Sequence, residues 1–190
     1  MYSMNHATKD DIEKIMNIFK ANRKWFPHVR EYHIKTRIGR NQVILEDDVV
    51  ITYHLYTRNQ PLSKKDKEGN NIGKEVMAEK GDCILHQIVK DKESKSKASA
   101  VLQKFFKTVK SNKVYLSVRS NNFKAIEFYL RNSMKLVGHT TWSEGKMPGD
   151  IYLYENHLFV KPPEKIKVKK VKVKKVKVKK VTTLEEHYEL

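Results

Sequence analysis

The sequence predicts a mixed α/β fold with α+β layering, in which helices flank a largely antiparallel sheet in the order ααββ, loop, βαβαββ. Between residues 83 and 118 the hydrophobic period changes from that of a strand to that of a helix and back. This change predicts a right-handed crossover between two neighbouring parallel strands. The β-rich segments on either side have the pattern of hairpins, whose strands pair antiparallel. The lysine-rich C-terminus predicts a disordered basic tail.

The first third of the chain is predicted to hold two helices and a hairpin. Thr8 is a good N-cap, and apolar residues at helical spacing follow it, which predicts a helix over about 9–22. Pro27 favours the start of a second short helix. Segments 42–45 and 49–56 are rich in β-branched and aromatic residues around an acidic turn, which predicts a tight antiparallel hairpin.

The polar segment 58–81 is predicted to form a long, mobile surface loop, because nothing in it favours burial. Beyond it the pattern predicts a strand at 83–89, a helix over about 96–111, a strand at 114–118, a helix at 122–132, and final strands over about 135–143 and 150–159 around a turn that contains Gly145, Pro148 and Gly149.

Charge and complexity divide the chain into a domain over 1–160 and a low-complexity tail over 161–190. The formal net charge is +17; eleven lysines and four glutamates give the tail +7, which leaves +10 on the body. A basic body attracts polyanions such as nucleic acid, anionic lipid or a phosphorylated cofactor. A solvated lysine-rich surface explains the charge alone equally well.

Several classes of protein are disfavoured by composition. Cys83 is the only cysteine, so no internal disulfide can form. The N-terminus lacks a signal-peptide pattern, and no apolar stretch approaches the roughly 20 residues that span a bilayer. The histidines and the cysteine show no metal-ligand spacing. We therefore expect a cytoplasmic protein without a membrane partner or a bound metal.

The tail repeats Val-Lys-Lys-Val-Lys at 168–172 and 173–177. Its valines alternate between spacings of three and two, which fits neither a helix face nor a strand face. Repulsion between the lysines predicts an extended chain. Two roles stay open for it: nonspecific, salt-sensitive contact with nucleic acid through phosphates, or a solvated spacer.

The most specific motif lies between Val114 and Met134. A strand ending in Val-Arg is followed by Asn122, Ala125 and Tyr129 in the pattern Asn-x-x-Ala-x-x-x-Tyr. This stretch resembles the second half of the signature of GNAT N-acetyltransferases. Ser133 and Met134 stand where that family usually has Gly-Phe.

The resemblance implies acetyl-CoA as co-substrate and a primary amine as acceptor. Spacings of three and four place Asn122, Ala125 and Tyr129 along one helix face. By resemblance, Asn122 would bond the pantetheine arm, small Ala125 would allow close approach, and the Tyr129 phenol would protonate the departing CoA thiolate. The alternative interpretation makes Tyr129 a core aromatic and Asn122 an ordinary N-cap.

The family's pyrophosphate loop usually carries glycines just before a helix, whose backbone N–H groups and dipole hold the phosphates. Here residues 90–100 contain none. In one register Lys95, Ala98 and Ala100 take the motif positions, and in another Lys97 and Ser99 do. The candidate cofactor-binding residues of this segment are Lys95, Ser96, Lys97, Ala98 and Ser99. A position that needs positive φ would be strained without glycine.

The preceding strand, which includes Gln87, Ile88 and Val89, would by resemblance offer backbone groups to the pantetheine amides. Its splaying from the strand at 114–118 would open the cleft for the acyl group. Some relatives carry a glutamate base where this chain has Ser117. Candidate bases here are His86, which a packed structural histidine would also explain, a water chain, or one of Glu46, His54 and Glu79.

By resemblance, the predicted N-terminal helices would form the acceptor wall. Trp25, Phe26, Tyr32 and His33 could contribute to it unless they pack in the core. The function predicted is acetyl transfer from acetyl-CoA to a primary amine. Two alternatives are a catalytically inactive binding module with the same fold, suggested by the glycine-free loop, and a nucleic-acid-associated protein such as an aminoacyl-tRNA acetyltransferase, suggested by the basic body. The acceptor and the oligomeric state are left open.

Overall fold

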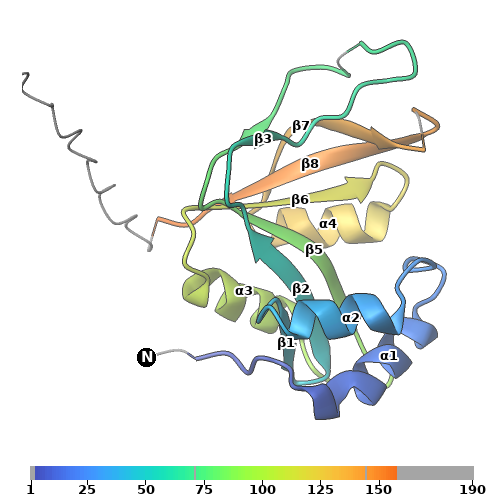
Figure 1. Ribbon diagram of the computed structural model, residues 1–190, viewed down its shortest axis with the longest axis vertical. Helices are drawn as coiled ribbons and strands as arrows, with labels where there is room; N and C mark the ends of the chain where they lie inside the picture. The colour runs from blue at the N-terminus through green and yellow to red at the C-terminus, as the bar shows by residue number, and fades with distance from the viewer. Residues whose placement is uncertain (1–2, 71, 144, 158–190) are drawn as a thin grey trace, which may run out of the picture.

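The computed structural model describes residues 3–70, 72–143 and 145–157, and the predicted tail over 161–190 lies outside them. A six-stranded sheet runs through these residues in the order β1-β2-β5-β6-β8-β7 (Figure 1). Its strands are β1 (Val43–Glu46), β2 (Val49–Leu55), β5 (Cys83–Lys90), β6 (Lys113–Arg119), β7 (Lys135–Trp142) and β8 (Met147–Glu155). Only β5 and β6 pair in parallel, which confirms the predicted crossover and the largely antiparallel sheet.

Helices cover both faces of the sheet (Figure 1). On one face, α3 (Ala98–Thr108) and α4 (Phe123–Arg131) pack on β1, β2, β5, β6 and β8 through a core that includes Phe105, Leu85 and Leu116. On the other face, α1 (Ile12–Ala21) and α2 (Glu31–Ile38) cover β1, β2 and the end of β5. No helix in the described part of the chain is long and apolar enough to cross a membrane.

The N-terminal elements follow the prediction with one correction. A short 3-10 turn, η1 (Lys9–Asp11), leads into α1, and Thr8 exchanges hydrogen bonds with Asp11 as expected of a cap. The second helix begins at Glu31 and not at Pro27, because residues 22–26 first form turns back onto α1.

The predicted hairpin is confirmed as β1 and β2. Asp47 and Asp48 turn the chain with φ values of 47° and 59°. Consecutive positive φ values are those of the two-residue turn that suits twisted antiparallel strands. The acidic turn region also ties the two helical layers to the sheet: Lys14 of α1 pairs with Asp48, and Lys104 of α3 pairs with Glu46.

The prediction that nothing in 58–81 favours burial is wrong. The segment contains a small two-stranded sheet of β3 (Gln60–Pro61) and β4 (Met77–Ala78). Val76 and Ala78 are buried in a third apolar cluster on the sheet, against Tyr56 and Ile151 among others. Val76 fits only because β7 has a glycine there, since a Cβ on Gly138 would lie 2.4 Å from its side chain.

The last hairpin turns earlier than predicted. Pro148 and Gly149 lie inside β8, which begins at Met147. Gly149 does not serve as a turn residue: a Cβ there would lie 2.1 Å from the Trp142 ring across the hairpin. The glycine therefore permits close packing between β7 and β8.

The feature that positions the site is the divergence of β5 and β6. The two strands pair only at Cys83 with Val114 and at Ile84 with Tyr115. Beyond these pairs, β5 continues along β2 and β6 continues along β8, so a wedge opens between the two strands. The splaying predicted from the family resemblance is thus present.

Ser133 follows the C-terminal end of α4 with φ of 65°, the left-handed conformation in which glycine is preferred. A serine there carries a steric cost of about 1 kcal/mol. We expect Ser133→Gly to raise the free energy of unfolding by roughly 0.5–1 kcal/mol in a urea titration. Asn41→Gly, at φ of 54°, is the matched control and should gain less, because asparagine tolerates this region. An unchanged or lower stability of Ser133→Gly would contradict the strain.

Candidate active site

A groove of about 1530 Å³ passes through the wedge and is lined by residues from both faces of the sheet. One side is formed by the α1–α2 turn, α2 and the C-terminal end of β2, and the other by β6 and α4. Because β5 and β6 do not pair beyond Ile84 and Tyr115, their facing backbone edges border this groove without a strand partner in the described structure. Such edges can hydrogen-bond an extended ligand.

The three motif residues of α4 share the face of the helix that lines the groove. Asn122 caps the helix, with its side-chain oxygen 3.4 Å from the Ala125 nitrogen, so the N-cap interpretation is correct for its local contact. Asn122, Ala125 and Tyr129 nevertheless all line the groove. Their predicted common face is confirmed, while their roles toward a ligand remain predictions.

Tyr129 belongs to the apolar core and also reaches the groove. Only 9% of the residue is exposed, and it packs among the residues of the α3–α4 cluster. Burial raises the pKa of its phenol well above the usual value. The phenol therefore stays protonated over the physiological range, as a proton donor must.

The predicted β5 segment lines the groove along its whole length. Gln87, Ile88 and Val89 all border it. The side chain of Gln87 accepts a hydrogen bond from Thr52 of β2, and Ile88 packs against the core. These contacts hold the side chains of β5 in place while its edge toward β6 stays open.

The predicted phosphate loop is only partly at the groove. Ala98 lines it, whereas Lys95, Ser96, Lys97 and Ser99 are not among its lining residues. Two cations that the prediction did not single out, Lys90 and Lys92, border the groove in addition. The structure leaves both registers of the motif open.

Local bonds explain the shape of this loop. The Ser96 hydroxyl lies 2.8 Å from that of Ser94, whose oxygen also accepts a bond from the Ser96 nitrogen. The Ser99 hydroxyl donates to Asn132 on the turn after α4 at 2.6 Å. Side-chain hydroxyls thus fix the segment that glycines occupy in the family pattern.

The absence of glycine does not strain this loop. Every residue over 91–97 has negative φ, since the non-glycine residues with positive φ lie elsewhere in the described chain. The backbone nitrogens of Lys97, Ala98 and Ser99, at the start of α3, have no hydrogen-bond acceptor among the described residues. They are available to a phosphate at the positive end of the helix dipole.

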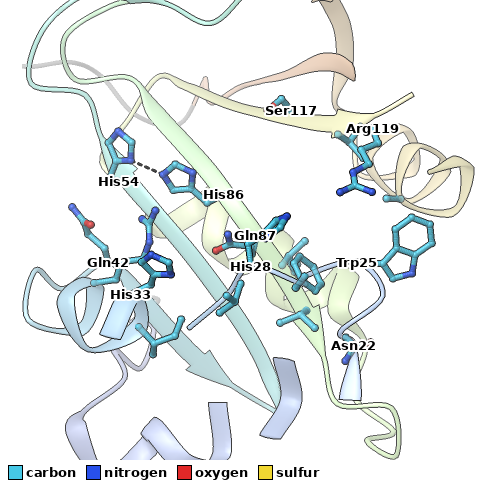
Figure 2. Close-up of a pocket in the computed structure, with 18 of the residues that line it drawn as sticks. Asn22, Trp25, His28, His33, Gln42, His54, His86, Gln87, Ser117 and Arg119 are labelled. Atoms are coloured by element: carbon cyan, nitrogen blue, oxygen red, sulfur yellow. Dashed lines mark hydrogen bonds between the residues drawn. The ribbon is translucent and has the colours of Figure 1, made fainter. Parts of the chain in front are cut away.

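A pair of histidines was not predicted as a unit. Nδ1 of His54 lies 2.7 Å from Nε2 of His86, and Figure 2 shows the two rings facing each other across β2 and β5. The pair arises from a β-bulge: Thr52 pairs with Gln87 and Tyr53 with Leu85, so His86 is the extra residue. A bulge re-aims a side chain in this way, and sequence alone does not locate it.

The charge of this pair is set by its surroundings. Burial, the Arg37 guanidinium and His54 together lower the pKa of His86 to about 3. Burial and Arg37 also lower the pKa of His54. Both rings are therefore neutral near pH 7, so one nitrogen of the contact donates and the other accepts.

The other candidate bases are placed away from the groove. Glu46 is paired with Lys104, and Glu79 with Lys113 at 3.8 Å, and neither lines the groove. Both are therefore wrong as bases at this site. Ser117 does border the groove on β6 (Figure 2), where it provides a hydroxyl and no carboxylate.

The aromatic residues considered for the acceptor wall lie at the groove, while their contact with an acceptor stays a prediction. Trp25 and Tyr32 line the groove with exposed fractions of 39% and 64%, so they are not core residues. Phe26 lines it as well and makes an edge contact with Phe19 at 5.4 Å between ring centroids, which fixes the turn between α1 and α2. His33 also lies at the groove (Figure 2).

The architecture was compared with known proteins. No protein-family model matches the sequence, and no curated protein matches it significantly. Solved structures do match. A GNAT-family acetyltransferase from Streptococcus agalactiae superposes with a TM-score of 0.62 at 12% identity, covering 80% of this chain and 94% of that one. The chain has the GNAT acetyltransferase fold.

Two further GNAT-fold structures match over a similar extent. Naa20 from Chaetomium thermophilum, solved with a bisubstrate analogue, gives a TM-score of 0.59 at 9% identity and covers 82% of this chain and 87% of that one. A ribosomal-protein alanine N-acetyltransferase from Escherichia coli gives 0.55 at 11% identity and covers 86% and 98%. At these identities the shared property is the GNAT fold itself, so the activity has to be argued from the site.

The His86 ring predicts how stability depends on pH. Its folded pKa of about 3 lies below the ordinary 6.5, so the unfolded chain binds a proton that the folded one does not. This contribution is present above pH 6.5 and is lost as the pH falls toward 3. We expect the wild type to lose roughly 2 kcal/mol more than His86→Gln between about pH 6.5 and 4.5, measured by urea unfolding.

A matched control for this measurement is His28→Gln, which removes an exposed histidine at the same groove. It should keep the wild-type slope. If His86→Gln and the wild type lose stability in parallel over this range, the ring is not held neutral by the fold.

Proposed function

We propose that this protein is an N-acetyltransferase that moves an acetyl group from acetyl-CoA to the primary amine of an acceptor. The observation that carries the proposal is the groove through the β5–β6 wedge, which has the Tyr129 phenol on one face of the sheet and the His54–His86 pair on the other. The GNAT fold supports acetyl transfer in general.

The groove fits CoA in shape and charge. The open backbone edges of β5 and β6 suit the amides of the pantetheine arm. The free N–H groups at the start of α3 suit the pyrophosphate. The cations at this end of the groove are Lys90, Lys92, Arg119 and Lys124, which match the phosphates of CoA in sign.

In the proposed reaction, the acceptor amine loses a proton to His54, which is less deeply buried than His86 and is oriented by it. The neutral amine attacks the thioester carbonyl carbon, and backbone N–H groups of β5 stabilise the oxyanion that forms. The C–S bond then breaks as the new amide forms. The departing CoA thiolate takes the proton of the Tyr129 phenol. The new amide nitrogen then loses its second proton, which returns to the Tyr129 phenolate and restores the phenol.

Titration calorimetry with acetyl-CoA tests the proposal most directly. We expect saturable binding with a dissociation constant in or below the roughly 1 μM–1 mM range in which enzymes commonly bind substrates. The alternative of an inactive binding module was suggested by the glycine-free loop. The unstrained backbone of that loop removes this reason for it. An absence of binding at millimolar acetyl-CoA would reject the acetyltransferase and leave only the shared fold.

Removal of the phenol should separate chemistry from binding. We expect Tyr129→Phe to lower kcat by about 10²-fold or more while the dissociation constant of acetyl-CoA changes little, because only proton donation to sulfur is lost. The matched control is Tyr154→Phe, on a ring that stacks on Phe106 and does not line the groove. Equal turnover of Tyr129→Phe and the wild type would remove Tyr129 from the mechanism.

The histidine pair should set the acid side of the pH–rate profile. Because its pKa lies below 6.5, His54 is neutral and able to accept a proton at neutral pH. We expect kcat/KM to fall at a pH below the ordinary histidine pKa of 6.5, and His54→Gln to lose this limb together with about 10²-fold of turnover at pH 7. An unchanged profile in His54→Gln would assign proton removal to another group.

A further inference from the structure

Three arginines supply the charge at the acceptor end of the groove. Arg37 of α2, Arg40 just after it and Arg58 after β2 all border this end. Four histidines line the same groove: His28, His33, His54 and His86. Among the described lining residues of the whole groove there is no aspartate and no glutamate.

These arginines have no ionic partner within the described chain. The carboxylates near α2 and the hairpin are used elsewhere: Glu31 pairs with Lys35, Asp48 with Lys14, and Glu46 with Lys104. No described carboxylate forms an ion pair with Arg37, Arg40 or Arg58. Arginines that lack a carboxylate partner can be neutralised by the negative charge of an anionic ligand.

Arg37 is the central member of the group. It is half-buried, and burial together with neighbouring Arg40 lowers the pKa of its guanidinium, although it stays charged at neutral pH. Its charge also acts on both rings of the histidine pair. The guanidinium therefore lies near the place where the acceptor amine would lose its proton.

On the basis of these arginines, and resting on the proposed acetyl transfer, we propose that the acceptor is an amine that carries an anionic group, a carboxylate or a phosphate, a few atoms from its nitrogen. Arg37 binds that group, assisted by Arg40, through charge-assisted and bidentate hydrogen bonds. The exposed rings of Trp25 and Tyr32 line the same groove and are available to contact the rest of the acceptor.

An anionic acceptor distinguishes between classes of amine, although the sequence alone left the acceptor open. Polyamines and lysine-rich peptides bring further positive charge into a wall of arginines, which costs binding free energy. An amine with a neighbouring anion instead replaces the missing partner of Arg37. Selectivity therefore comes as much from repulsion of cationic amines as from attraction of anionic ones.

Binding of simple anions tests the site without any acceptor. Phosphate and succinate, used as separate probes for the two anion types, are titrated into the full chain in the presence of excess CoA, which occupies the phosphate loop. The imidazole NMR signals of His54 and His86 report binding. We expect saturable shifts for at least one probe, and an affinity weakened about tenfold or more in Arg37→Gln.

Arg23→Gln is the matched control, because it removes the same charge from an exposed arginine outside the groove lining. It should bind the probes like the wild type. Absence of saturable shifts in the wild type, or equal weakening by both substitutions, would overturn the proposal. Succinate alone or phosphate alone producing the shifts would assign the anion type.

Turnover of matched acceptors provides the second arm. Peptides that differ only at their second residue, as serine, phosphoserine, aspartate or lysine, are compared by release of CoA. We expect kcat/KM to be about tenfold or more higher for an acidic member than for lysine, and the difference to shrink in Arg37→Gln through KM. Equal rates for all four would overturn the anionic acceptor while leaving acetyl transfer intact. A failure to bind acetyl-CoA would instead reject the transferase, and the anionic acceptor with it.

Discussion

The site depends on one constraint: the parallel strands β5 and β6 are hydrogen-bonded only at their N-terminal ends and diverge beyond them. β5 is held along β2 by antiparallel pairing, and β6 is held in the same way along β8. Each strand pairs more extensively with its outer neighbour than with its parallel partner, because only two residue pairs join β5 to β6. Sheet twist then separates them, and backbone that would normally be paired becomes a ligand surface. The wedge is a product of topology rather than of particular side chains in it.

This origin explains what the sequence could and could not predict. The strand–helix–strand order follows from a change of hydrophobic period, and the common face of Asn122 and Tyr129 follows from helical spacing, so both were predicted correctly. The His54–His86 contact depends on a bulge, and a one-residue insertion in pairing register has no signal in a single sequence. The burial of Val76 had no signal either, because it depends on a glycine in β7 some sixty residues away.

The neutral pair and the arginine wall are linked electrostatically. Arg37 helps to keep both imidazoles unprotonated by its own charge, and the same charge attracts an anion to their side. An anion bound at Arg37 would partly cancel that effect and make His54 more basic at the moment when the amine is in place. Recognition of the acceptor and preparation of the base would thus be one event, carried by a single guanidinium on α2.

The serine-rich turn before α3 has a consequence for how this protein could change. Its backbone stays in the region that any L-residue adopts, and hydroxyl contacts such as those of Ser96 and Ser99 fix its course. Glycine-based phosphate loops accept few substitutions, because their conformation excludes a side chain. Here the positions other than these serines can carry a new side chain without backbone distortion. The surface beside the end of the groove proposed for the nucleotide is therefore open to redesign at these positions, one residue at a time, with the rest of the molecule left as it is.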